Sequence, residues 1–154
     1  MIIVASNSPG ESSSLLELME VSGWPATACN SIRSFAGMVL REVPRLIIVR
    51  QRLEDGYSDD VLRIIAEFQV RLRTRVIVLL PANAAPASLV RQIELGADCV
   101  QRDPVRSDVL LAYVGRYLRE VNGGGKSEPG NQPRTTKFAD ATWRADERSL
   151  TLRS

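Results

Sequence analysis

Histidine is missing from this 154-residue chain, and cysteine and aromatic residues are scarce. Without histidine the chain lacks the commonest general base, the commonest metal ligand and any Ser-His or Cys-His nucleophile pair. The two cysteines, Cys29 and Cys99, match no metal-binding or redox spacing. We therefore expect a domain that is not an enzyme and that needs neither a cofactor nor a metal.

Long apolar runs are missing as well. None reaches the roughly 18 residues that a membrane span requires. The N-terminus shows no basic segment followed by an apolar one, as a signal peptide would. Isolated cysteines fit a reducing compartment. We therefore expect a cytoplasmic protein with no membrane partner.

The excess of positive charge is confined to the end of the chain. Residues 1–121 contain 14 Arg, no Lys and 14 Asp or Glu, and are formally neutral. Residues 122–154 contain 6 Lys or Arg and 4 Asp or Glu, and 6 minus 4 gives the whole net charge of +2. A neutral domain has no electrostatic footprint for nucleic acid, and the tail is too weakly basic to be a binding arm by itself.

Short apolar runs alternate with amphipathic, helix-like segments in the first 120 residues. The strand-like runs lie at residues 2–6, 26–30, 45–49, 75–80 and 97–101. Five such strand-helix units predict a parallel sheet covered on both faces. The expected fold is α/β and flavodoxin-like: a doubly wound (βα)5 domain with a five-stranded parallel sheet in the order 2-1-3-4-5. Its functional edge lies at the carboxyl ends of the strands, where Ser6, Asn7, Arg50, Leu80 and Asp103 stand.

Composition changes after residue 121. Residues 122–137 are rich in Gly, Pro, Ser and Asn, and predict a flexible linker. Residues 138–154 suggest two short strands around a turn, which together would be marginal in water. We expect a domain at 1–121, the linker, and the start of a second, incomplete domain.

The segment VIVLLPANAAPASLVRQIELGADCVQRDPV, residues 76–105, resembles the stretch from the fourth to the fifth strand of a bacterial response-regulator receiver domain. Its GAD motif and Pro104 are the most specific part. MIIVAS and RLIIVR fall where the first and third strands of that CheY-like fold belong. The tail FADATWRADERSLTL resembles the first strands of the winged-helix output domain of OmpR/PhoB-type regulators.

The resemblance also implies where phosphotransfer residues would stand, and this chain differs at every one. Arg50 replaces the aspartate that accepts the phosphoryl group, and Ser6 and Asn7 replace the acidic pair that holds Mg²⁺. Leu80 replaces the Ser or Thr after the fourth strand, and Asp103 replaces the Lys before the proline. The aromatic residue of the fifth strand is matched by Val100. The resemblance is therefore to an atypical, degenerate receiver.

Arg50 and Asp103 look like the receiver's acid and base with their signs exchanged. We predict that they form an ion pair, which would replace a switchable charge with a fixed one because Arg stays protonated. Two alternatives remain open: Arg50 points to solvent, or it pairs with Glu54 or Asp55 of the following loop.

OmpR-type receivers pair through the fourth helix, fifth strand and fifth helix, here residues 87–95, 98–102 and 106–120. Tyrosines with an apolar body and a polar tip suit a half-buried interface. The resemblance and this pattern predict a two-fold homodimer, with a monomer as the alternative. The expected interface residues are Leu89, Arg91, Asp98, Val100, Tyr113, Arg116, Tyr117 and Arg119.

The sequence as a whole favours a phosphorylation-independent receiver domain of a transcriptional response regulator. It would control assembly, and the full regulator would bind promoter DNA through its output domain. A regulatory protein partner is possible. The alternative is a stand-alone receiver-like interaction module with no DNA-binding role.

Overall fold

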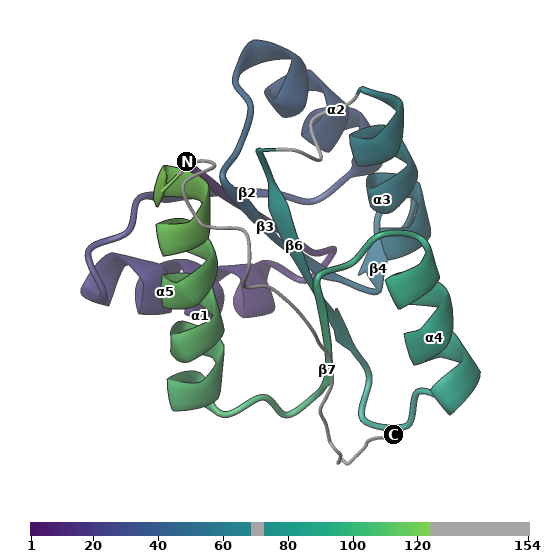
Figure 1. The fold of residues 1–154 in the computed structure, drawn as a ribbon. Helices are drawn as coiled ribbons and strands as arrows, with labels where there is room; N and C mark the ends of the chain where they lie inside the picture. Colours follow the sequence, from purple (N-terminus) through teal and green to yellow (C-terminus); the bar gives the residue numbers. More distant parts are fainter. Residues whose placement is uncertain (69–72, 124–154) are drawn as a thin grey trace. The chain divides into compact units, whose positions relative to one another are not determined.

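The computed structural model describes residues 1–68 and 73–123, and the fold belongs to the unit Met1–Leu118. Five parallel strands form the sheet in the order β2-β1-β3-β6-β7 (Figure 1). They are β1 (Ile2–Ala5), β2 (Ala26–Cys29), β3 (Leu46–Arg50), β6 (Arg75–Leu80) and β7 (Cys99–Arg102). With a short hairpin left out of the count, this is the predicted order 2-1-3-4-5, and the flavodoxin-like α/β fold is confirmed.

Five helices cover the two faces of the sheet. They are α1 (Pro9–Val21), α2 (Ile32–Arg41), α3 (Ser58–Glu67), α4 (Pro86–Glu94) and α5 (Ser107–Gly123). Figure 1 shows α1 and α5 on one side of the sheet, and α2, α3 and α4 on the other. This arrangement follows from right-handed crossovers between parallel strands, which send successive helices to one face until the strand order reverses.

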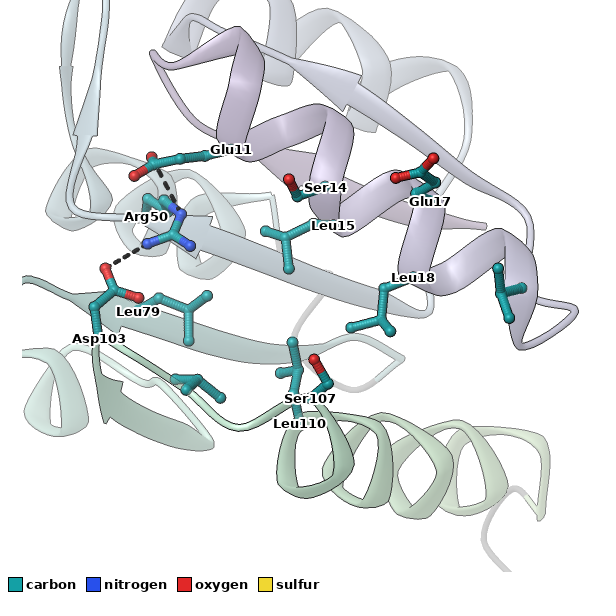
Figure 2. Close-up of a pocket in the computed structure, with 12 residues that line it drawn as sticks. Glu11, Ser14, Leu15, Glu17, Leu18, Arg50, Leu79, Asp103, Ser107 and Leu110 are labelled. Carbon is teal, nitrogen blue, oxygen red and sulfur yellow. Dashed lines mark hydrogen bonds and ion pairs between the residues drawn. The ribbon is translucent and has the colours of Figure 1, made fainter.

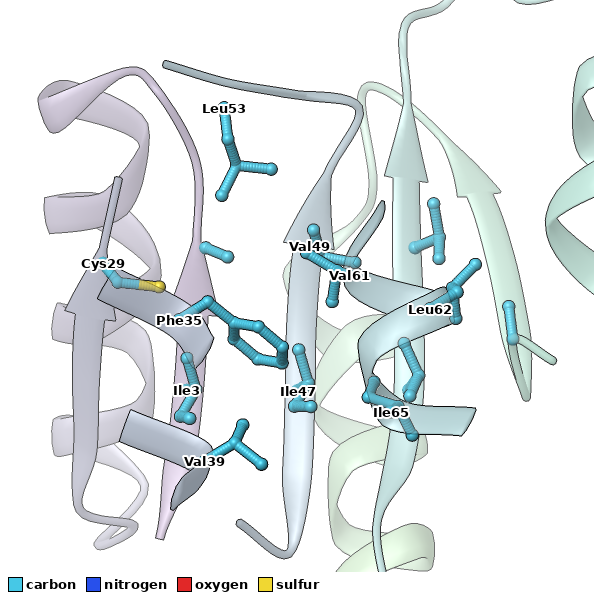
Figure 3. Packing of buried hydrophobic residues seen from close by; sticks show 14 of the residues in the cluster. Ile3, Cys29, Phe35, Val39, Ile47, Val49, Leu53, Val61, Leu62 and Ile65 are labelled. Carbon is cyan, nitrogen blue, oxygen red and sulfur yellow. The ribbon is translucent and has the colours of Figure 1, made fainter. Parts of the chain in front are cut away.

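Each face has its own apolar cluster, because successive strand residues point to opposite faces. Val4 and Ile48 pack under α1 and α5, whereas Ile3 and Ile47 pack under α2 and α3. Figure 3 shows the second cluster, in which the fully buried ring of Phe35 lies against the sheet. Each such buried apolar side chain stabilises the fold by roughly 1.5–3 kcal/mol.

Local sequence signals set the ends of two helices. The side chain of Ser31 accepts a hydrogen bond from the Ser34 N–H at 3.0 Å and caps the start of α2. Gly23 follows α1 with φ of +83°, a backbone conformation that glycine adopts without steric cost. Gly96 plays the same role after α4, with φ of +115°.

The polar segment after β3 is ordered as a short hairpin. Arg52–Leu53 (β4) and Gly56–Tyr57 (β5) pair antiparallel as a small hairpin. Leu53 is buried and inserts into the core, so one apolar side chain anchors the turn. A Cβ at Gly56 would lie 2.5 Å from an Asp60 carboxylate oxygen, which explains why glycine stands there.

Two features of α3 depart from its sequence pattern. Ser58 is a residue type that often caps helices, but it is the first helical residue and is buried, while the Asp60 carboxylate accepts from the Tyr57 N–H. The helical spacing of apolar residues continues to Phe68, but the helix ends at Glu67 and the Phe68 side chain is 40% exposed.

The last helix reaches Gly123, two residues into the segment expected to be a linker. The rest of that linker and the strands expected in 138–154 lie outside the described residues. Within residues 1–68 and 73–123, no helix is long and apolar enough to cross a membrane. The same part of the chain holds no group of three His, Cys, Asp or Glu residues arranged to bind a metal.

Candidate functional site

Arg50 and Asp103 meet at the carboxyl edge of the sheet. Arg50 ends β3, and Asp103 directly follows β7. The Nη1 atom of Arg50 donates a hydrogen bond to Asp103 Oδ2 at 2.5 Å (Figure 2). The Asp103 N–H donates to the Leu80 carbonyl at 2.8 Å, which fixes the backbone of Asp103 beside β6. The structure thus brings together the two residues whose exchanged signs suggested a pair.

Glu11 is a second anionic neighbour of Arg50. Its Oε1 lies 3.3 Å from Arg50 Nε, although the buried Nε has no hydrogen bond of good geometry. The contact is therefore an ion pair by distance only. Sequence reasoning missed Glu11, yet its signal was present. Ser8 followed three residues later by Glu11 is a helix-start pattern, and it places Glu11 in the first turn at this edge.

One cation and two carboxylates give this site a formal charge of −1. The side chains of Arg50 and Asp103 are 18% and 32% exposed, so their attraction is only partly screened by water. Arg stays protonated at ordinary pH, so the charge at the end of β3 cannot be switched off. Chemically, the arrangement holds two strand ends together and offers no free nucleophile.

The loop acids that could have competed for Arg50 are engaged elsewhere. Glu54 accepts a hydrogen bond from the Asn30 side chain at 3.0 Å. Asp55 accepts from the N–H groups of Ile32 and Arg33 at the start of α2. These backbone bonds, led by the one from Ile32, hold the pKa of Asp55 below its ordinary value.

Ser6, Asn7 and Leu80, the other three residues predicted at this edge, do not join the ion pair. Ser6 is buried, and its Oγ donates to Glu11 Oε1 at 3.3 Å, so it touches the site indirectly. Asn7 is exposed, and its N–H donates to the Arg52 carbonyl. Leu80 is fully buried in the apolar cluster that lies under α2 and α3. Successive strand residues point to opposite faces, so Leu80 points away from the face on which Arg50 and Leu79 lie. The structure does not bring Asn7 or Leu80 side chains to the pair.

An apolar groove runs from Arg50 between α1 and the start of α5, as Figure 2 shows. Its volume is about 500 Å³. Its apolar lining consists of Leu15, Leu18, Val21, Leu79, Val105 and Leu110. The ion pair lies at one end of the groove, and Ser14, Glu17 and Ser107 add polar groups beside the aliphatic walls.

The predicted interface tyrosines are not equivalent. Tyr113 is half-buried, and its ring stacks on that of Tyr117 at 6.1 Å between centroids. Tyr117 is buried in the core, and its hydroxyl donates to the Asp98 carbonyl at 3.3 Å. It lies next to Leu118 on the core face of α5. Burial leaves Tyr117 little surface to offer a second copy, and its place in the dimer interface stays a prediction.

Two charged residues of the predicted interface already have partners within the chain. Arg91 Nε lies 2.6 Å from Asp59 Oδ2. Asp98 Oδ2 accepts from the Val76 N–H at 2.8 Å, which joins the start of β7 to β6. Both residues thus have partners within the single chain, and their part in a dimer interface stays a prediction.

The remaining interface candidates are placed more simply. Leu89 and Val100 are half-buried and pack against the apolar cluster that lies under α2 and α3. Arg116 and Arg119 are exposed. The sequence did not single out the large apolar side chains that the structure leaves exposed on α4, Val90 at 52% and Ile93 at 57%.

Comparisons with known proteins place the fold. No family model matches the chain, and no curated protein matches it. Among solved structures, one neighbour is the signal receiver domain of a protein described as a Luxo repressor, from Vibrio parahaemolyticus (TM-score 0.74, 20% identity, 83% of this chain and 96% of that one). Another is the receiver domain of a signal transduction histidine kinase from Syntrophus aciditrophicus (TM-score 0.70, 23% identity, 89% and 98%).

A third neighbour is the beryllofluoride-activated NtrC4 receiver domain dimer (TM-score 0.70, 18% identity, 78% of this chain and 97% of that one). Each of these likenesses spans nearly the whole neighbouring domain. The CheY-like fold expected from the sequence is thereby confirmed: residues 1–118 have the fold of response-regulator receiver domains.

Proposed function

We propose that this domain is a receiver-type signalling module that works without phosphorylation, within a transcriptional response regulator. The observation that carries the proposal is the Arg50–Asp103 ion pair at the carboxyl edge of the sheet. It stands where the resemblance to receivers puts the phosphoryl-accepting acid and its lysine partner. A permanent pair there makes the conformation of this edge independent of a phosphodonor.

The chemistry of the edge argues against phosphoryl transfer. A phosphoryl acceptor needs a free carboxylate, and Mg²⁺ prefers carboxylate oxygens. The two carboxylates at the site, Glu11 and Asp103, both face Arg50. A metal ion drawn to them would have to lie beside a fixed guanidinium, which repels it.

We further propose that the domain acts by self-association through α4 and α5. Val90, Ile93 and Val109 are exposed apolar side chains on these two helices. Apolar side chains at the centre of an interface provide most of its hydrophobic gain. Since no charge at the edge can be switched, the homodimer would form without activation. Leu89, Val100, Tyr113, Arg116 and Arg119 would surround its centre.

The transcriptional part of the proposal rests on the likeness of FADATWRADERSLTL to the start of a winged-helix domain. Promoter DNA would be bound there and not by residues 1–121, which are formally neutral. A regulatory protein is a second class of partner that the α4–α5 surface would fit.

The test is incubation of the purified chain with a small-molecule phosphodonor and Mg²⁺, followed by intact-mass measurement. A phosphorylatable receiver domain in the same tube is the control. We expect the control to gain the mass of one phosphoryl group and this chain to gain nothing. A Mg²⁺-dependent, base-labile phosphoryl adduct on this chain would falsify the proposal.

A further inference from the structure

Helix α4 is anchored by a polar side chain. Within Pro86–Glu94, all of whose residues the structure describes, Gln92 is the only buried residue, at 4% exposed. Leu89 is half-buried, and Val90 and Ile93 face outward. An amphipathic helix ordinarily turns its apolar stripe to the core. What fixes the position of α4 must therefore include the polar contacts of Gln92.

Those contacts form a chain of hydrogen bonds between α3 and α4. The fully buried Ser58 Oγ donates to Gln92 Oε1 at 2.8 Å. Gln92 Nε2 donates to Asp59 Oδ1 at 2.7 Å. Arg91 Nε donates to the other carboxylate oxygen of Asp59 at 2.6 Å. Both ends of the Gln92 amide and both oxygens of Asp59 are thus satisfied.

This network is sensitive to the position of α4. A glutamine amide satisfies Ser58 and Asp59 together only when α4 lies at one distance and rotation from the start of α3. Moving α4 would leave buried donors and acceptors without partners, which costs more than a net hydrogen bond is worth. A buried leucine in place of Gln92 would tolerate sliding, because apolar contact has no direction.

We propose that Ser58, Asp59 and Gln92 act as a clasp that holds α4 in one fixed position and keeps Val90 and Ile93 facing outward. The clasp rests on the proposed function, since it supplies a permanently presented α4 surface in a domain without a phosphoryl switch. Gln92 is a positioning residue: it acts on the surface through α4 and does not itself contact a partner.

Amide hydrogen exchange of the full chain, at concentrations where it is monomeric, tests the clasp. Gln92→Leu keeps the side-chain size and removes the amide. We expect exchange of the α4 amides to rise about tenfold or more, while those of β1 and β3 stay protected. Glu67→Gln is the matched control, since Glu67 is an exposed polar residue at the far end of α3 from Ser58 and Asp59.

The double variant Ser58→Ala with Gln92→Leu separates a clasp from simple packing. Gln92→Leu alone leaves the buried Ser58 hydroxyl without an acceptor, and Ser58→Ala removes that hydroxyl. The double variant should therefore regain part of the urea midpoint that Gln92→Leu loses, while exchange of the α4 amides stays fast. Unchanged α4 exchange in Gln92→Leu, or an equal rise in every element, would overturn the proposal. Should Gln92→Leu fail to fold, wild-type exchange decides: α4 must be as protected as α3. Because the readout is monomeric, absence of a dimer would contradict only the proposed function.

Discussion

The guanidinium of Arg50 reaches the carboxylate of Asp103 across the end of an intervening strand. Arg50 belongs to β3 and Asp103 follows β7, and β6 lies between them in the sheet. Only a long side chain can span two strand spacings of roughly 4.8 Å each. The pair therefore ties the end of β3 to the end of β7 across β6, at the edge where a flavodoxin-like fold ordinarily places its chemistry.

Glu11 should support this pair weakly. Glu11→Gln removes the second carboxylate near Arg50 but leaves Asp103 in place. The Glu11 side chain is 47% exposed, so solvent screens its contribution. We expect a loss of less than about 1 kcal/mol in the free energy of unfolding, measured in urea.

Glu17→Gln on the same helix is the control, since Glu17 makes no contact with Arg50 and should change stability less. A loss from Glu11→Gln above about 3 kcal/mol would instead show Glu11 to be the main partner of Arg50.

The fold could be predicted from the sequence because its signals are redundant. Strands such as IIVA and RVIVLL are buried on both faces and read as continuous apolar runs. The hairpin at 52–57 could not be predicted in this way, since only Leu53 carries an apolar signal. The end of α3 could not be predicted from apolar spacing either, because that spacing continues to Phe68 whereas the helix ends at Glu67.

Self-association should depend on the exposed apolar pair of α4. Val90→Glu and Ile93→Glu place charges at the centre of the proposed interface, where burial of an unpaired charge is costly. We expect each to weaken association at least tenfold, measured by sedimentation, without lowering the urea midpoint.

Val21→Glu is the matched control, because Val21 is 84% exposed but lies on α1. Equal weakening by all three substitutions, or by none, would show that α4 is not the interface.

Acid should loosen the contact between α3 and α4. Burial raises the pKa of Asp59, but hydrogen bonds from Gln92 and Arg91 outweigh it and leave the pKa below its ordinary value of 3.8. A depressed pKa in the folded state means that Asp59 stabilises the fold above that ordinary value. The contribution is lost as pH falls through the lowered pKa.

Asp59→Asn should therefore be less stable than wild type at neutral pH, and the gap should narrow below about pH 4. Urea midpoints measured across that range give the comparison. Curves that stay parallel down to the acid limit would contradict the assignment.

Neither cysteine should react in the folded protein. Burial raises the pKa of the Cys29 thiol to about 11. Burial is also the main reason why the pKa of the Cys99 thiol is raised to about 12. At about pH 8 less than roughly one thiol in a thousand is then ionised, and the thiolate is the reactive form. We expect an aromatic disulfide reagent to label both only after urea is added. Rapid labelling of either cysteine without denaturant would count against this.

The site was less predictable than the fold, for physical reasons. Exchanged signs at Arg50 and Asp103 could be read from the sequence because both stand at strand ends. The helix-start pattern places Glu11 at the same edge, but its contact with Arg50 could not be predicted, since that depends on how α1 is turned toward β3. The burial of Tyr117 could not be predicted, because a tyrosine's apolar ring suits the core as well as an interface. Gln92 gave no signal at all, because a glutamine in an amphipathic helix is ordinarily assigned to the solvent face.

A double-mutant cycle on Arg50 and Asp103 is the most direct test of whether these two residues form a fixed ion pair. Arg50→Met, Asp103→Ala and the double variant are unfolded in urea alongside the wild type. Each single change leaves a partly buried charge without its partner, whereas the double change removes both. We predict that the double variant loses less stability than the two single variants' losses added together, with a coupling of roughly 1–3 kcal/mol. Coupling within about 0.5 kcal/mol of zero would contradict a fixed ion pair at this edge.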